Sequence, residues 1–375
     1  MNFREFWQKN RANYFWHFIV CLITFTATSL GFKGCYYPVP PAPIFREEPR
    51  PTGWVPDPEA VAQVVRGLQF KTFADTRAGK EEDPLPKQVF LWQAYVKLFN
   101  KLPPAKNQGS IGSCVSFGTN NAVARSLAVA IAFQGQPFDF LDFAEEVTYG
   151  GSRVQIGHGG IHGDGSTGAW AAQFVKEWGI VSREKHGSYD LSAYSVSLCR
   201  KFGSAGVPDD LQAIAKKQPV KTITQITTWD EAKRALANGY GIAVCSSQGF
   251  TEQRNAKGVC QPHGSWSHCM CLDGYATDDD GKEYGHIENS WGPDVFTGPT
   301  GWGSPSTAGF YASSAVVAKM LKAGDSWAFS AVTGFPPQKI DWFALRPDVP
   351  AEKMVPLSPV VSKGVSHEIP LRMGS

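Results

Sequence analysis

Residues 107–117 read Asn-Gln-Gly-Ser-Ile-Gly-Ser-Cys-Val-Ser-Phe, and this stretch ends a loop and begins an apolar segment. Ser113 is a favoured N-cap residue, and it predicts a helix that starts at Cys114 and continues to Phe133. The buried face of this helix would carry an apolar residue every four positions, at Val123, Leu127 and Ile131. Because a helix N-terminus stabilises a thiolate, Cys114 is a candidate nucleophile.

Three other polar residues supply what a thiol nucleophile needs. His268 can accept the thiol proton, and Asn289 can hold the imidazole ring in position. Gln108 lies six residues before Cys114 and can donate its side-chain amide to an oxyanion. Together these groups indicate acyl transfer by a cysteine nucleophile.

The order glutamine, cysteine, histidine and asparagine resembles that of the papain-like cysteine peptidases. The resemblance covers residues 100–335 and rests on four separated motifs, which include Ser267-His268-Cys269 and Asn289-Ser290-Trp291-Gly292. It implies a two-lobed α+β fold, with a helical lobe that carries Cys114 and an antiparallel β lobe that carries His268 and Asn289. It also implies a thiol endopeptidase that needs no metal and no cofactor.

The resemblance implies a role for each motif residue. Cys114 would be the nucleophile, His268 the proton carrier and Asn289 the residue that orients the imidazole. Gln108 and the backbone N–H of Cys114 would stabilise the oxyanion, and Trp291 would shield the Asn289–His268 hydrogen bond. A glycine-rich strip would pair with the substrate backbone, at Gly163, Asp164, Gly165 and Ser166. The pocket for the second substrate residue before the scissile bond would be bordered by Val244, Ser267 and Cys269. Because these residues are small or apolar, the pocket would favour an apolar substrate side chain.

The chain departs from the family pattern in three places. Ile111 replaces the cysteine that the family carries three residues before the nucleophile, and Gly163 replaces its usual partner, so both halves of one disulfide are missing together. Val115 replaces an aromatic residue that follows the nucleophile. Residues 36–90 lack the helical motif of the usual inhibitory propeptide, which favours a short or different prosegment.

Composition excludes several classes of protein. The chain has 375 residues and a net charge of +2, so its charge does not favour nucleic acid as a partner. Eight cysteines are too few for a disulfide-dense scaffold. Cys269 and Cys271 lack the second pair of ligands that a structural zinc site requires, and we expect them to pack as small hydrophobes on one face of a strand.

The chain divides into four predicted regions. Residues 1–35 contain a basic tail followed by an apolar run at 14–32, a pattern that is typical of a signal peptide or membrane anchor. The protein would therefore be membrane-anchored or secreted, with its catalytic domain on the extracytoplasmic side. Residues 36–87 form a proline-rich spacer that can include a short prosegment. Residues 88–335 form a monomeric peptidase domain that acts on peptides or proteins, and residues 336–375 form a tail.

Residue patterns predict the main elements of the domain. Helices are expected over 58–70 and 169–178, and strands over 241–245, 268–276, 284–291, 310–313 and 328–334. The sequence Asp278-Asp279-Asp280-Gly281 lacks the closing glutamate of a calcium loop and predicts a hairpin turn. Four further histidines are expected in loops or at the surface, namely His158, His162, His263 and His286.

Two alternatives remain open. A cell-wall peptide amidase can work with a Cys-His pair and would not need Gln108 or the Asn-Ser-Trp motif. A catalytically silent papain-fold binding protein would keep the fold with a blocked cleft. Labelling with an epoxysuccinyl thiol probe separates a live enzyme from the silent protein, because an adduct at Cys114 supports the former and its absence favours the latter.

Overall fold

A computed structural model describes residues 50–136, 142–217, 220–302 and 306–342. The predicted membrane segment, residues 14–32, lies outside these ranges, as do residues 36–49 of the spacer and 343–375 of the tail. Every helix within the described ranges is too short or too polar to cross a membrane.

Most helices precede residue 216, and they include two 3₁₀ turns (η1, η2) and one π-helical turn (η3). The helical elements are α2 (Pro58–Arg66), η1 (Phe73–Asp75), η2 (Ala78–Lys80), α3 (Trp92–Phe99), α4 (Cys114–Gln134), α5 (Glu145–Gly150), η3 (Gly151–Ile156), α6 (Gly168–Glu177), α7 (Val196–Ala205), α8 (Asp209–Ala215), α9 (Trp229–Ala237) and α10 (Ser314–Leu321). The strands are β1 (Gln88–Phe90), β2 (Lys185–His186), β3 (Tyr189–Asp190), β4 (Thr222–Gln225), β5 (Ile242–Phe250), β6 (Pro262–Thr277), β7 (Glu283–Glu288), β8 (Gly309–Ser313) and β9 (Asp325–Ser330).

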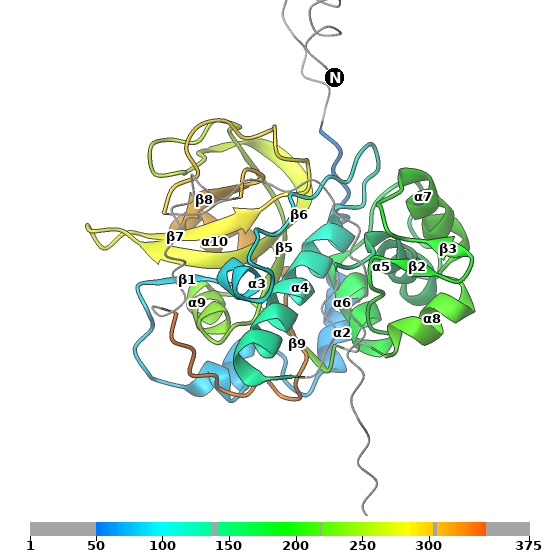
Figure 1. Cartoon of the computed structure of the whole chain (residues 1–375), viewed down its shortest axis with the longest axis horizontal. Coiled ribbons are helices and arrows are strands. Elements are labelled where there is room, and N and C mark those ends of the chain that lie inside the picture. Colours follow the sequence, from blue (N-terminus) through cyan, green and yellow to red (C-terminus); the bar gives the residue numbers. More distant parts are fainter. Residues whose placement is uncertain (1–49, 137–141, 218–219, 303–305, 343–375) are drawn as a thin grey trace, which may run out of the picture. The chain divides into compact units, whose positions relative to one another are not determined.

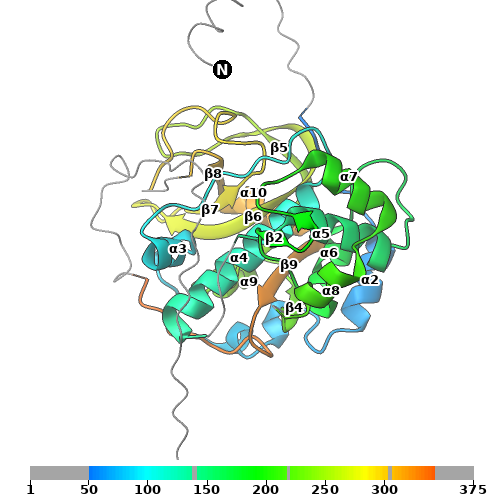
Figure 2. The ribbon, with the colours of Figure 1, turned by 45° about the vertical axis from the view of Figure 1, so that its right-hand side comes forward.

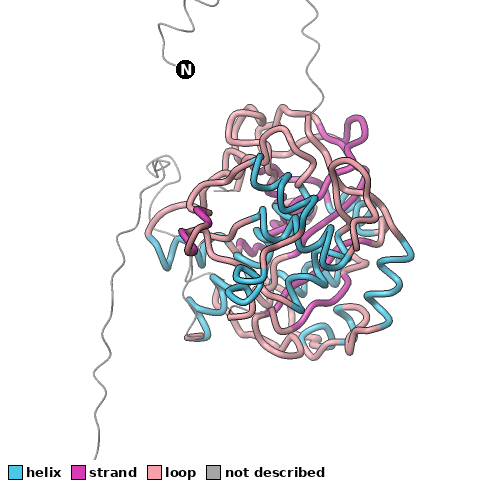
Figure 3. Tube along the Cα trace, turned by 90° about the vertical axis from the view of Figure 1, so that its right-hand side faces the viewer, coloured by secondary structure: helices cyan, strands magenta, loops and turns pink. Residues whose placement is uncertain are grey.

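The main sheet is antiparallel and has the strand order β4-β9-β5-β6-β7-β8, with β1 also paired to β6. The helices α5 to α8 and the β2–β3 hairpin lie on one side of α4, and β5 to β8 lie on the other (Figures 1 and 2). Viewed from the helical side, the helices lie in front of most of the strands (Figure 3). This arrangement confirms the predicted helical lobe and antiparallel β lobe.

Successive residues of β5 and β6 point into two different cores, as the period of a strand requires. Val244 and Met270 belong to the core that the sheet shares with α9 and α10. Cys269 and Cys271 belong to the core that the sheet shares with α4 and α6. Both cysteines are fully buried, so the prediction that they pack as small hydrophobes on one face is confirmed.

Helix α4 lies between the two lobes, and it is buried on all sides over Cys114–Ala130 rather than along one stripe. The sequence predicts one buried face because it does not reveal that helices cover one side and strands the other. Gly118 permits the close approach, since a β-carbon there would lie 2.9 Å from Sγ of Cys269. Ser113 precedes the helix, but its hydroxyl shares a 3.0 Å hydrogen bond with the hydroxyl of Tyr194 and does not cap it.

A buried ion-pair network ties α4 to β6 and β7. The guanidinium of Arg125 donates to Asp273 at 3.0 Å and also pairs with Glu288. Asp273 lies 2.6 Å from Nδ1 of His286, and all four side chains are buried. The prediction of a loop or surface role for His286 was therefore wrong. The network fixes the helix of the candidate nucleophile relative to the two strands.

The compact domain extends beyond the predicted limits of 88 and 335. Residues 50–87 belong to the same compact unit as the sheet, and Phe73 is fully buried in the core. At the other end, the indole of Trp342 donates to the carbonyl of Ala237 at 2.8 Å and is buried. The predicted spacer and tail are thus wrong over 50–87 and 336–342, because apolar side chains anchor both segments.

Candidate active site

The candidate catalytic residues meet where α4 begins. His268 lies within β6 and Asn289 follows β7, and His268 Nε2 is 2.8 Å from Asn289 Oδ1. The same oxygen accepts the backbone N–H of Ser290, so Nε2 carries the proton and donates it. Nδ1 then has a lone pair, and it has no hydrogen-bond partner among the described residues. The backbone N–H of Cys269, directly after this histidine, points at the sulfur of Cys114.

Gln108 is held against the loop that follows β7. Its backbone N–H donates to the carbonyl of Ser290 at 2.8 Å, and its side-chain oxygen accepts the Ser290 hydroxyl at 2.7 Å. The amide nitrogen donates to the carbonyl of Ile111 at 2.9 Å and to the carbonyl of Pro51 at 3.2 Å. The indole of Trp291 donates to the same Pro51 oxygen at 2.9 Å. A peptide carbonyl of the chain itself therefore accepts from the Gln108 amide, one of the two donors predicted to stabilise the oxyanion.

Residues 50–55, which we call the N-terminal strap, lie across these side chains. The backbone N–H groups of Gly53 and Trp54 both donate to the carbonyl of Ser267 at 3.0 Å. Ser166 accepts one hydrogen bond from the strap and donates another to it, each at 2.9 Å, in a parallel bridge. In Figure 1 the blue trace that begins at residue 50 passes between β6 and α7. The strap makes the backbone pairing that the sequence analysis assigns to a substrate.

The strap closes the cleft completely. Cys114, His268 and Gln108 each have 0% exposed surface. Gly53 passes so close to the loop before α4 that a β-carbon would overlap the backbone of Gly112. The candidate nucleophile is thus inaccessible while the strap is bound.

Burial under the strap keeps both reactive groups neutral. It raises the pKa of Cys114 far above that of a free thiol, although nearby backbone N–H groups act in the opposite direction. It lowers the pKa of His268 to about 4, although the hydrogen bond to Asn289 opposes this shift. The ring of Trp291 adds apolar cover, with its centroid 4.6 Å from that of the imidazole. A thiolate–imidazolium pair therefore requires that the strap leaves.

The glycine-rich strip lies beside the strap and is held from η3. Arg153 donates to the carbonyl of Gly163 at 2.7 Å and also to that of Gly165. Asp164 accepts the backbone N–H of Gly112 at 3.2 Å, which ties the strip to the loop before α4. One guanidinium thus positions backbone groups in this part of the cleft.

An apolar contact occupies the place of the missing disulfide. Ile111 is fully buried against Tyr149 and Cys199. The hydroxyl of Tyr149 accepts the backbone N–H of Gly165 at 3.1 Å. Val115 is also fully buried, in the core shared by α4 and the sheet. The two sequence departures are therefore accommodated by packing, and the described cysteines are all free thiols.

The side chain of Trp54 is buried in the core that also contains Cys269, and the space that it fills is called the pocket below. The indole is 7% exposed and donates to Asp325 Oδ2 at 2.8 Å. Cys245 and Cys269 are directly paired across β5 and β6, with their sulfur atoms 2.6 Å apart, and belong to the same core as Trp54. Val244 points into the other core, so the prediction that it borders this pocket was wrong. The period of the strand gives that place to Cys245 instead.

Sequence reasoning missed two residues of this pocket. Asp325 begins β9, whereas the predicted strand started only at residue 328. An acidic residue at the edge of an apolar strand was the available signal. Trp54 lies in the proline-rich stretch that we interpreted as a spacer, where a lone tryptophan indicates a docked segment.

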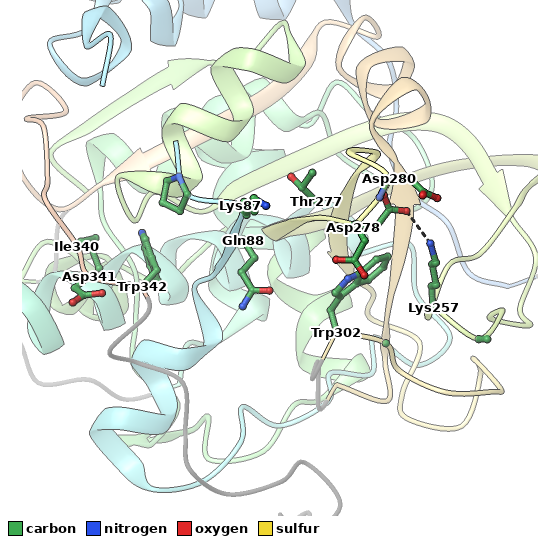
Figure 4. A pocket seen from close by; sticks show the side chains of 14 residues that line it. Lys87, Gln88, Lys257, Thr277, Asp278, Asp280, Trp302, Ile340, Asp341 and Trp342 are labelled. Atoms are coloured by element: carbon green, nitrogen blue, oxygen red, sulfur yellow. Dashed lines mark hydrogen bonds and ion pairs between the residues drawn. The ribbon is translucent and has the colours of Figure 1, made fainter. Parts of the chain in front are cut away.

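A cavity of about 910 Å³ lies elsewhere, between the β6–β7 hairpin and the C-terminal segment (Figure 4). Its wall includes Lys87, Trp302 and Trp342, and none of the candidate catalytic side chains. Asp278 on this wall is paired with Lys257 at 2.8 Å and forms the predicted hairpin turn. The candidate catalytic cleft is separate from this cavity, and the strap fills it.

Comparison with known proteins assigns the family. The description "papain family cysteine protease" matches residues 89–304 of this chain. The chain therefore belongs to the papain family of cysteine proteases, which is the class and fold that the sequence predicted.

Two curated proteins and one solved structure are similar to this chain. Cysteine proteinase 1 of Entamoeba histolytica is 27% identical over 54% of this chain and 58% of its own length. The probable cysteine protease RDL3 of Arabidopsis thaliana is 26% identical over 57% of this chain and 52% of its own length. The chain thus spans a little over half the length of these relatives. Xylellain, a cysteine protease from Xylella fastidiosa, aligns with a TM-score of 0.47 and 16% identity over 76% of this chain and 93% of its own.

Proposed function

We propose that this protein is a cysteine endopeptidase whose catalytic residues are Cys114, His268, Asn289 and Gln108. The observation that carries the proposal is the strap, which holds the carbonyl of Pro51 on the Gln108 amide. A cleft that binds a peptide backbone in this way is suited to peptide and protein substrates.

The proposed reaction begins with transfer of the Cys114 proton to Nδ1 of His268. The sulfur attacks the carbonyl carbon, and the resulting oxyanion accepts hydrogen bonds from Gln108 Nε2 and the Cys114 backbone N–H. The imidazolium gives its proton to the leaving amine, and a thioester remains. His268 then takes a proton from water, which hydrolyses the thioester and restores the thiol. Asn289 keeps the ring in the tautomer that both steps need.

The strap must leave before a substrate binds, and its direction explains why it is a poor substrate itself. It runs from Pro51, at the Gln108 amide, to Trp54, in the pocket. A substrate that places its second residue before the scissile bond in this pocket runs the opposite way, from pocket to amide. The strap therefore presents its peptide bonds to Cys114 in reversed polarity.

Hydrolysis of quenched fluorescent peptides by the full chain tests the proposal. Because Gly53 cannot accept a β-carbon beside Gly112, Gly53→Ala supplies a chain with a loosened strap. We expect cleavage by Gly53→Ala and none by the Gly53→Ala/Cys114→Ala double variant. Cleavage retained in the double variant would refute the role of Cys114.

The alternatives give different results in the same assay. A silent binding protein would leave peptides intact and Cys114 unlabelled by an epoxysuccinyl probe, even in Gly53→Ala. An amidase that uses only a Cys-His pair would keep its rate in Asn289→Ala. The interlocking contacts of Gln108 and Asn289 with Ser290 support the peptidase.

We further propose that residues 14–32 direct export or anchor the protein, with a monomeric domain on the extracytoplasmic side. This proposal rests on the sequence alone, since these residues lie outside the described ranges. N-terminal sequencing of the mature protein tests it. A start downstream of residue 32 indicates a cleaved signal, and a start at residue 1 in the membrane fraction indicates an anchor.

A further inference from the structure

Two cysteines face each other across the central strands of the sheet. Cys245 in β5 and Cys269 in β6 are direct partners in the antiparallel ladder, and their sulfur atoms lie 2.6 Å apart. Directly paired residues of antiparallel strands have Cα atoms about 4.5–5.5 Å apart, which is within the range of about 4.4–6.8 Å that a disulfide spans. A disulfide bond of about 2.0 Å therefore requires the two sulfur atoms to approach by only about half an ångström.

The surroundings of the pair leave room for a bond between the two sulfur atoms. Gly118 of α4 lies against Cys269, and its missing side chain provides the space, since a β-carbon there would lie 2.9 Å from the sulfur. Both cysteines are fully buried in the core that the sheet shares with α4 and α6. The described residues include no group of three histidine, cysteine or acidic side chains that could hold a metal ion, so the pair does not belong to a metal site.

Cys271 shows that burial alone does not produce such a pair. It lies two residues further along β6, on the same face and in the same core, but its direct partner in β5 is Ala243. Among the described cysteines, Cys245 and Cys269 are the two that are directly paired across neighbouring strands. Cys271 therefore supplies a matched control for the pair.

The pair lies at the end of the regular β5–β6 ladder, beside the candidate catalytic residues. His268 precedes Cys269 and pairs with Ser246, and the register shifts directly after this position. The backbone N–H of Cys269 points at the sulfur of Cys114. A covalent link at Cys269 would therefore fix the backbone of β6 at the point where it carries the histidine and faces the candidate nucleophile.

We propose that Cys245 and Cys269 are a modification site and form a disulfide bond when the chain folds in contact with a small disulfide oxidant, such as oxidised glutathione. One cysteine thiolate attacks a sulfur of the oxidant, which gives a mixed disulfide and releases one thiolate of the oxidant. The second cysteine then attacks the cysteine sulfur of the mixed disulfide and releases the other oxidant thiolate. The pair loses two electrons and two protons, and the oxidant is reduced to two thiols.

The exchange takes place before the core closes, because the folded protein protects the pair. Neither cysteine is exposed, and burial raises the pKa of Cys245 well above that of a free thiol, so the reactive thiolate is scarce. The same burial keeps reductants away from the finished bond. Such bonds persist in oxidising compartments, which the export proposed for residues 14–32 would reach. The proposal does not depend on peptidase activity.

Peptide mapping of the full chain tests the bond. The reduced protein is held in a mixture of reduced and oxidised glutathione at a urea concentration just below its unfolding midpoint, where the core opens repeatedly. It is then alkylated with iodoacetamide in strong denaturant, digested and analysed by mass spectrometry. We expect a linked Cys245–Cys269 peptide in at least about 90% of the chains, with Cys271 alkylated. Alkylated Cys245 and Cys269 in most chains, or a link from either one to another cysteine, would overturn the proposal.

Thermal unfolding measures what the bond does to the fold. The oxidised wild type should have a Tm about 5 °C or more above that of the reduced wild type, because the link joins residues 24 positions apart and restricts the unfolded chain. Cys271→Ala should keep this difference, and Cys245→Ala should abolish it. The two states of the wild type decide the matter even if a variant does not fold, and equal Tm values for them would contradict the proposal. Neither measurement uses peptide hydrolysis, so both stand if the proposed peptidase activity fails.

Discussion

Acidification should loosen the strap through His268. Burial lowers the pKa of this ring to about 4, whereas a solvated imidazole titrates near ~6.5. Between these values the ring is neutral under the strap and takes up a proton when the strap lifts. Because the lifted form binds the extra proton, lowering the pH through this window favours lifting. The full difference, about 2.5 pKa units, corresponds to roughly 3 kcal/mol or about 300-fold in the opening equilibrium.

Hydrogen–deuterium exchange at Gly53 and Trp54 measures this equilibrium, because both N–H groups are bonded to the Ser267 carbonyl when the strap is bound. After correction for intrinsic exchange, their protection should fall as the pH drops from about 7 to about 4.5. Asp325 acts in the opposite direction, since burial raises its pKa and the closed form holds its proton more tightly. The difference between wild type and His268→Gln therefore isolates the imidazole. The same pH dependence in both proteins would refute the reasoning.

Three further substitutions probe other contacts. Gly53→Ala should raise the rate of Cys114 alkylation about 5- to 150-fold, the range expected for a steric cost of roughly 1–3 kcal/mol. An unchanged rate would mean that the strap does not control access. Arg125→Met removes the guanidinium from two buried carboxylates, so the free energy of unfolding measured in urea should fall by about 3–5 kcal/mol. A decrease below about 1 kcal/mol would contradict a stabilising role of the network. Gln108→Ala, assayed in the Gly53→Ala chain, should lower kcat about 10²- to 10³-fold with little change in KM. A rise in KM of the same size with kcat unchanged would indicate that Gln108 binds the substrate instead.

The sequence predicts this fold well where the signal is local. The helix at Cys114, the strand that carries His268 and the strand that Asn289 follows are predicted from periodicity and motif order, and the family assignment supports them. The prediction of Val244 as a pocket residue failed by one position, since a one-residue error in a strand moves a side chain to the other face.

Long-range contacts account for most of what the sequence does not reveal. The docking of Trp54 on Asp325 joins positions 271 residues apart, and no local pattern encodes it. The burial of His286 depends on Asp273 across the β6–β7 pair in the same way. Both cases involve polar groups whose partners become visible only after the sheet has formed.

The strap directly precedes α2, and that helix packs on α6. It is therefore a tethered ligand, and the fraction of closed molecules depends on an effective concentration rather than on the amount of protein. Short tethers give effective concentrations on the order of millimolar. Dilution leaves such a contact intact, and a free peptide has to compete with that local concentration. Cutting the chain between the strap and α2 would turn the same hydrogen bonds into a bimolecular complex that dissociates on dilution.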